Sequence, residues 1–258
     1  MQTSKYEAIK LSEIDKKYLV DTIVVEAPLQ ININNEPYTV IMRTPGQDEY
    51  LIRGLLYAED IYKGEENFKV KIIENTPNDF SVVNINIAEN LLGKGYMNKR
   101  TLLSVSSCGI CGKQTLDSIK ASGSKLMGVN SLDAILISKM FDTMKKYQAT
   151  FKLTGASHAS AIFDKKHELL AINEDIGRHN AVDKAIGELL NKQQLHKSKI
   201  ILVSGRVSYE IVTKAFIAKI KTIIAVSGCS SLAIDFAKEF GIELIGFSRG
   251  SISTIYSQ

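Results

Sequence analysis

The sequence predicts an α/β protein with a smaller β-rich N-terminal domain, and three observations lead to this class. Short apolar runs alternate with amphipathic segments over residues 158–247, which indicates a sheet covered by helices. All four prolines lie before residue 80, so the character of the chain changes near that point. The composition is 45% hydrophobic and 23% charged, which excludes a disordered chain and a small disulfide scaffold.

The part before residue 90 is expected to be rich in strands. Apolar and β-branched runs predict strands at 20–26 and 29–33, and Asn34-Asn35 marks a turn to a return strand at 38–43. Apolar residues at helical spacing predict a helix over 47–62. Strands at 69–74 and 81–88 predict a second hairpin.

The part after residue 130 is expected to alternate between helix and strand. Ser131 is suited to cap a helix that runs to residue 147. Strands are predicted at 158–163, 169–173, 200–203, 223–226 and 243–247, with helices at 178–190, 209–220 and 231–240. We therefore expect a largely parallel sheet and three segments: a β-rich domain over 1–105, a mobile loop over 106–130 and an α/β domain over 131–258.

The net charge and the hydropathy pattern limit which kinds of ligand the protein could bind and in which cell compartment it could lie. The formal net charge of +4 and the pI near 8.8 permit an anionic ligand. No apolar run approaches the about 20 residues of a membrane span, and the polar start is unlike a signal peptide. We expect a cytoplasmic protein that binds neither membranes nor nucleic acid. Three cysteines in a reducing compartment suggest metal or sulfur chemistry rather than disulfides.

Cys108-x-x-Cys111 is the strongest chemical motif. One interpretation is a zinc site, but the chain lacks a second ligand pair at suitable spacing, so we expect no metal. Three other interpretations of the motif remain. It could be a thioredoxin-like redox pair, two cysteines without function, or a nucleophilic or sulfur-carrying thiol. Glycine and serine flank the motif, which favours an exposed, mobile thiol, and Lys113 nearby would favour its thiolate form.

A strand followed by Ser-Gly-x-x-Ser and a helix occurs twice. The two copies contain Ser204-Gly205-Arg206 and Ser227-Gly228. Consecutive βα units place such turns at one sheet edge, where α/β proteins bind ligands. Free N–H groups at helix N-termini and the hydroxyl groups are suited to phosphate.

Two further polar stretches are candidates for the same site. Residues 175–184 contain five ionisable residues that could contact a ligand or form a solvated helix start: Asp175, Arg178, His179, Asp183 and Lys184. His158 begins a strand in His-Ala-Ser, which is similar to the His-Ala-Glu of zinc deaminases but lacks the glutamate and the cysteine motif that their chemistry needs. Alternatively, this histidine is a structural residue whose ring has its hydrogen-bond partners within the fold.

The closing stretch of the chain is Phe247-Ser248-Arg249-Gly250-Ser251-Ile252. It is interpreted either as a β-turn or as a place where Arg249 and the backbone beside Gly250 meet a phosphate. Cys229 is most simply a small residue in a turn before a helix.

Taken together, these motifs resemble the formate dehydrogenase accessory sulfurtransferase family (FdhD). The resemblance extends over almost the whole chain, and its most specific stretch is Glu174-Asp175-Ile176-Gly177-Arg178-His179-Asn180-Ala181-Val182-Asp183-Lys184. It implies a cytidine-deaminase-like three-layer main domain. It also implies a sulfurtransferase that takes persulfide sulfur from a cysteine desulfurase and passes it to the Mo-bis(molybdopterin guanine dinucleotide) cofactor of formate dehydrogenase.

The resemblance also implies roles for particular residues. Cys108 would carry the persulfide with the help of Cys111, and Phe247 to Ile252 would bind the cofactor. A non-catalytic cofactor chaperone and a thiol redox protein remain alternatives. Because the cofactor has two guanosine ends, we further expect a two-fold homodimer.

Overall fold

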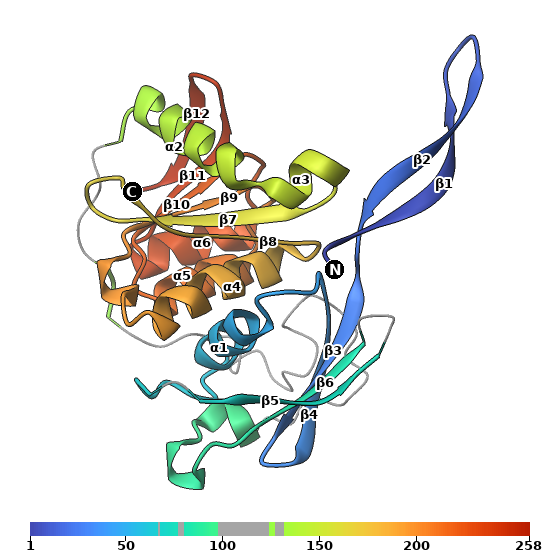
Figure 1. The fold of residues 1–258 in the computed structure, drawn as a ribbon. Coiled ribbons are helices and arrows are strands. Elements are labelled where there is room, and N and C mark those ends of the chain that lie inside the picture. Colours follow the sequence, from blue (N-terminus) through green and yellow to red (C-terminus); the bar gives the residue numbers. More distant parts are fainter. Residues whose placement is uncertain (67, 77–79, 98–123, 127–131) are drawn as a thin grey trace.

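A computed structural model describes residues 1–66, 68–76, 80–97, 124–126 and 132–258. Within them the chain forms a two-stranded arm, a four-stranded sheet and a six-stranded sheet. Helices cover the two larger sheets, and the arm projects from the body (Figure 1). None of the helices in these residues is long and apolar enough to cross a membrane.

The arm consists of the first two strands, β1 (Thr3–Leu11) and β2 (Lys16–Val24), which pair antiparallel. The sequence predicted only the end of β2 as strand and assigned no structure to the first 17 residues. This prediction was incomplete because most side chains of the arm are exposed on both faces. The alternation that marks a half-buried strand is therefore absent.

The four-stranded sheet holds β3 (Ala27–Ile33), β4 (Glu36–Arg43), β5 (Val70–Asn75) and β6 (Ser81–Ile85), in the order β4-β3-β6-β5. Asn34 and Asn35 both have positive φ, as the predicted tight turn between β3 and β4 requires. Helix α1 (Asp48–Ala58) buries Leu51 and Leu55 against this sheet. Two 3-10 turns follow at Glu89–Leu91 and Lys94–Met97.

The six-stranded sheet has the order β12-β11-β10-β9-β7-β8. Its strands are β7 (His158–Phe163), β8 (Leu169–Asp175), β9 (Ile200–Val203), β10 (Thr222–Ala225), β11 (Glu243–Arg249) and β12 (Ile252–Ser257). Strands β9, β10 and β11 are parallel, whereas β7 and β12 run against their neighbours. The sheet is thus mixed rather than largely parallel, because short connections join β7 to β8 and β11 to β12 as hairpins.

Helices cover both faces of this sheet, which makes three layers (Figure 1). Helices α2 (Ala134–Tyr147) and α3 (Ala149–Thr154) lie on one side, and α2 packs through Ile137, Met140 and Met144. The other face carries α4 (Arg178–Asn191), α5 (Tyr209–Ile217) and α6 (Ser231–Phe240). Asp133 caps α2 by accepting from Leu136 N at 2.7 Å. The predicted cap, Ser131, lies outside the described residues.

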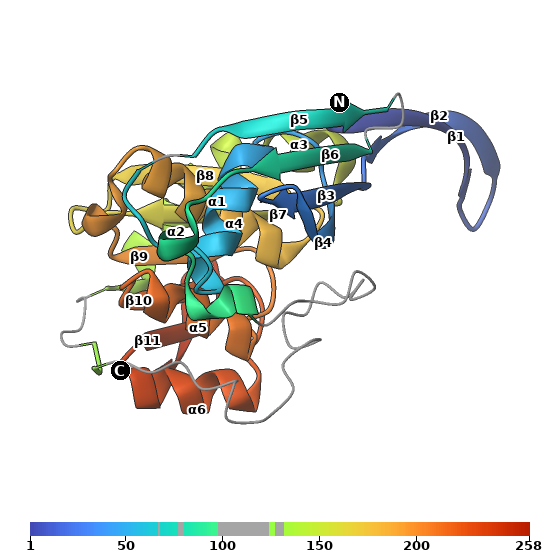
Figure 2. The same cartoon turned by 90° about the horizontal axis from the view of Figure 1, so that it is seen from below.

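Helices α1 and α4 join the two larger sheets, and α1 lies between the four-stranded sheet and α4 (Figure 2). Their backbones touch: a Cβ added at Gly54 would lie 1.9 Å from the carbonyl oxygen of Asp183, and one at Gly187 would lie 1.9 Å from that of Tyr50. Only glycine fits at these two positions. The predicted α/β class is therefore observed, whereas the domain bounds and the cytidine deaminase likeness stay predictions.

Candidate ligand site at the strand ends

Three predicted segments meet at one edge of the six-stranded sheet. The backbone N–H of Ala159, next to His158, donates to Ser204 Oγ at 2.9 Å. The two Ser-Gly turns are joined where Val207 N donates to Gly228 O at 3.0 Å. The closing stretch joins them, because Phe247 N donates to Ser227 O at 3.0 Å. The expected common edge for the two turns is confirmed.

His158 is half-buried at this edge and its Nδ1 lies 3.3 Å from Ser204 Oγ. Burial lowers the pKa of His158, and the positive charges of Arg178 and Arg206 lower it further, with Asp175 opposing them. The ring is therefore neutral at pH 7. A Cβ at Gly205 would lie 3.1 Å from His158 Nδ1, so the small residue lets the turn approach the ring.

Three arginines make the edge cationic. Arg178 is the first residue of α4, and its Nε is buried with no hydrogen-bond partner in the described part of the chain. Arg206 is exposed in the turn after β9. Arg249 is exposed at the end of β11 and its Nε donates to Val226 O at 3.3 Å. Three guanidinium groups at one edge suit an anionic ligand.

The closing stretch forms the turn between β11 and β12. Phe247 has a φ of 50° and Gly250 a φ of 59°. Positive φ is strained for a bulky side chain such as that of Phe247. The Phe247 ring is 48% exposed and lies over Gly228, where a Cβ would come within 2.8 Å of its Cζ. Ser248 is buried and accepts from Ser253 Oγ at 3.0 Å, whereas Ser251 and Ile252 are exposed.

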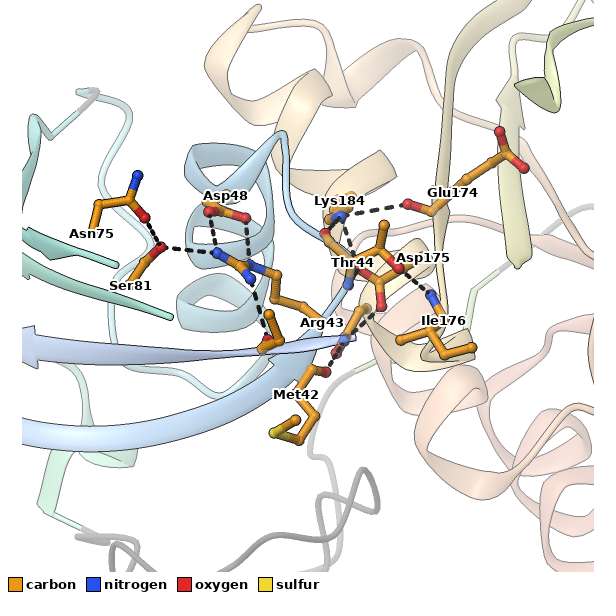
Figure 3. A network of polar contacts seen from close by, with 12 residues as sticks. Met42, Arg43, Thr44, Asp48, Asn75, Ser81, Glu174, Asp175, Ile176 and Lys184 are labelled. Carbon is orange, nitrogen blue, oxygen red and sulfur yellow. Dashed lines mark hydrogen bonds and ion pairs between the residues drawn. The ribbon is translucent and has the colours of Figure 1, made fainter. Parts of the chain in front are cut away.

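Asp175 and Lys184 form an ion pair in the interior, and their expected contact with a ligand stays a prediction. Both side chains are 0% exposed, and Lys184 Nζ lies 2.8 Å from Asp175 Oδ2 (Figure 3). Lys184 Nζ also donates to Thr44 O at 2.8 Å, while Asp175 Oδ2 accepts from Thr44 N at 3.1 Å. Asn180 Nδ2 donates to Asp175 Oδ1 and to Met42 O. These groups fasten the β4–α1 loop to the six-stranded sheet.

Asp183 and His179 are likewise placed in the interior. Asp183 is buried and its carboxylate pairs with Lys214 Nζ at 2.6 Å. His179 is buried, and its Nε2 lies 3.1 Å from both Glu210 Oε2 and Ser208 Oγ. These contacts place both side chains between α4 and α5 in this structure, and the expected ligand contact of the two residues stays a prediction.

Residues that the sequence analysis missed complete the buried network. Thr44 and Met42 contact residues that are more than 130 positions away. Arg43 is buried beside them and forms a two-point ion pair with Asp48, with Nε and Nη2 each 3.0 Å from a carboxylate oxygen. No local motif marks Met42 and Thr44, since the tertiary fold brings their partners to them.

The cysteines fall in two groups. Cys108 and Cys111 lie outside the described residues. Cys229 is half-buried in the turn before α6, and burial raises its pKa to about 11. Its thiol is therefore protonated at pH 7 and a poor nucleophile. Among the described residues, no group of acidic, histidine or cysteine side chains could hold a metal ion.

The fold and this edge define an α/β protein with a cationic site at its strand ends. The family model of the FdhD/NarQ family matches residues 24–258, and the chain belongs to this family. It is 36% identical over 265 residues to a "Sulfur carrier protein FdhD" of Streptomyces avermitilis, with 99% of this chain and 94% of that protein covered. It is 37% identical to the protein of that name from Sulfolobus acidocaldarius, over 100% of this chain and 97% of that one.

A solved structure has the same fold. It is a crystal structure from Desulfotalea psychrophila, described as that of a formate dehydrogenase accessory protein. The TM-score is 0.76 with 18% sequence identity, over 100% of this chain and 98% of that chain.

Proposed function

We propose that the chain is a sulfur carrier and sulfurtransferase required for formate dehydrogenase activity. In this proposal it takes persulfide sulfur from a cysteine desulfurase and passes it to the Mo-bis(molybdopterin guanine dinucleotide) cofactor. Family membership and the printed names of the relatives support the sulfur-carrying role. The proposed setting is the cytoplasm, with the desulfurase and formate dehydrogenase as partners.

The cationic strand-end edge is the observation that carries the cofactor part of the proposal. The cofactor, here a bound substrate, has two diphosphates and two guanine rings. Arg178, Arg206 and Arg249 would meet the phosphates. The buried Nε of Arg178 has no hydrogen-bond partner among the described residues, and such an anion would give it one. The exposed Phe247 ring would lie beside the ligand.

The first sulfur step needs only a thiolate. The thiolate of Cys108 would attack the outer sulfur of the desulfurase persulfide, so that one S–S bond forms and another breaks. The desulfurase cysteine then leaves as a thiolate, and no net oxidation occurs. Cys111 would assist the later release of the sulfur.

The test is persulfide loading followed by intact mass. After incubation with desulfurase and cysteine, the chain should gain about 32 Da, the mass of one persulfide sulfur. Cys108→Ala should lose this gain and still bind a guanine nucleotide. Cys229→Ala is the matched control, because its buried, protonated thiol should not be loaded.

Other outcomes would favour the alternative functions. Unchanged loading in Cys108→Ala would show that the carrier lies elsewhere. Nucleotide binding without any loading would favour a cofactor chaperone. A Cys108–Cys111 disulfide exchanging with thioredoxin, again without loading, would favour a redox protein. We retain the two-fold homodimer and the relation to cytidine deaminases as proposals.

A further inference from the structure

Ser204 begins the first of the two Ser-Gly turns, and its hydroxyl group is hydrogen-bonded inside the protein. Ser204 Oγ accepts from the backbone N–H of Ala159 at 2.9 Å and lies 3.3 Å from Nδ1 of His158. The backbone N–H of Ser204 also donates to Ala159 O at 3.0 Å. The turn after β9 is thus fastened to the start of β7, and the hydroxyl group of Ser204 is held beside the ring of His158.

The direction of the hydrogen bond between Ser204 and His158 follows from the donors and acceptors that meet there. A serine hydroxyl group has one proton to donate. In the part of the chain that the structure describes, only Nδ1 of His158 accepts it. A proton on Nδ1 would set two N–H donors against one hydroxyl group and leave the hydroxyl proton without an acceptor. In the neutral ring Nδ1 is therefore the acceptor, and the ring proton is on Nε2.

The other ring nitrogen, Nε2, remains available to a ligand. His158 is half-buried, and its Nε2 is neither hydrogen-bonded nor enclosed among the described residues. Burial lowers the pKa of His158, and the positive charges of Arg178 and Arg206 lower it further, whereas Asp175 opposes them. Both guanidinium groups therefore act on the ring. An acceptor that meets the Nε2–H group at this place also meets two cations, which favours a phosphate oxygen.

We propose that Ser204 is a positioning residue, which holds the neutral ring of His158 in the tautomer with its proton on Nε2, and that this N–H group donates to a diphosphate oxygen of the ligand. The inference rests on the proposed function, since the diphosphate is that of the guanine dinucleotide ends of the cofactor. Ser204 acts through the histidine and does not need to touch the ligand for this role.

A fixed tautomer matters because the two states of a neutral imidazole are opposite in hydrogen bonding. With the proton on Nδ1, the Nε2 lone pair would face the phosphate oxygen, and two acceptors would repel each other. Every molecule in that state would be unable to make the contact, and the apparent affinity would fall by the fraction lost. Gly205 supports the arrangement, since a Cβ there would lie 3.1 Å from Nδ1 of His158.

The tautomer is tested by nitrogen-15 NMR of the histidine rings in the full chain at pH 7, without ligand. His158→Gln identifies the signals of His158 by their loss. We expect the Nε2–H pattern in the wild type and a mixture of both tautomers in Ser204→Ala. Ser204→Thr keeps a hydroxyl group and should restore the wild-type pattern. Ser227→Ala, the matching change in the second Ser-Gly turn, is the control and should leave the His158 signals unchanged.

The ligand contact is tested by titration calorimetry with guanosine diphosphate. His158→Leu removes the donor and should weaken binding about tenfold or more. His158→Gln can place an N–H group near the position of Nε2 and should lose less. Ser204→Ala should weaken binding about two- to fivefold, through the population in the wrong tautomer. His196→Leu, a change of an exposed histidine in the turn Leu195–Lys197, is the control and should bind as the wild type does.

The outcomes separate this inference from the proposed function. An Nδ1–H ring in the wild type, or an unchanged ring pattern in Ser204→Ala, would overturn the positioning role of Ser204. Equal affinities for guanosine diphosphate in the wild type and His158→Leu would overturn the ligand contact while leaving the proposed function intact. A wild type that does not bind guanosine diphosphate would contradict the cofactor part of the proposed function and the ligand contact together, and the NMR result would still decide the tautomer.

Discussion

The buried contact between the two larger sheets and the open strand-end edge use the same residue types for opposite purposes. Asp175 and Lys184 sit in the buried contact, fully enclosed and paired at 2.8 Å. Arg178 comes from the same short segment but starts α4 at the edge, with its Nε unpaired within the described residues. The comparison teaches that burial and available partners, rather than residue type, separate a structural charge from one that is free to meet a ligand.

The energetic difference follows from solvation. A buried charge loses its hydration, and only close partners and further hydrogen bonds offset this cost. Lys184 has such partners in Asp175 and in the carbonyl oxygen of Thr44. The exposed guanidinium groups of Arg206 and Arg249 keep their hydration and can exchange water for a ligand.

The largest expected effect comes from breaking the buried pair. Lys184→Met leaves the Asp175 carboxylate buried without its cation, so the free energy of unfolding should fall by about 3–5 kcal/mol. Urea unfolding measures the change. Lys192→Met is the control: Lys192 is exposed where it pairs with the half-buried Glu188, and this pair should be worth less than about 1 kcal/mol. A loss for Lys184→Met no larger than the control's would refute a structural role.

The second-largest expected effect is on ligand binding at the strand-end edge. Arg249→Ala should weaken guanosine diphosphate binding by about 10- to 100-fold, because one charge-assisted contact is lost. Titration calorimetry of the full chain measures this change, while the free energy of unfolding should stay within about 0.5 kcal/mol. Lys238→Ala, an exposed cation on α6, is the control and should bind as the wild type does. Equal affinities in the wild type, Arg249→Ala and Lys238→Ala would show that the closing turn is not part of the ligand site.

The smallest effect is a pH dependence from His158. Its pKa is lowered in the folded chain, so the unfolded chain takes up this proton at a higher pH than the folded chain does. The contribution of the neutral ring is present above the ordinary histidine pKa of about 6.5. It is lost as pH falls through the lowered value. Urea unfolding from pH 7 to pH 5 should show a smaller decline in His158→Gln than in the wild type, and identical declines would contradict the assignment.

Several features of the strand-end edge were predictable because they follow from local order. Apolar runs between turn residues located β7 and β9 at their observed bounds, and the Ser-Gly repeat indicated that two turns share one edge. The roles within residues 174–184 were not predictable in the same way. A helix start with Arg, Asp and Lys has the same local sequence pattern whether its side chains face solvent or another part of the protein.

The sequence by itself determined the order of strands and helices in the α/β part, the repeated turns and the family to which the chain belongs. These depend on short-range periodicity and on motifs that are contiguous in the chain. Only the tertiary structure decided which charges are buried, since Thr44 and Asp175 meet across 131 positions. It also decided that the first residues form an arm, because a hairpin exposed on both faces has no buried side to leave a pattern in the sequence.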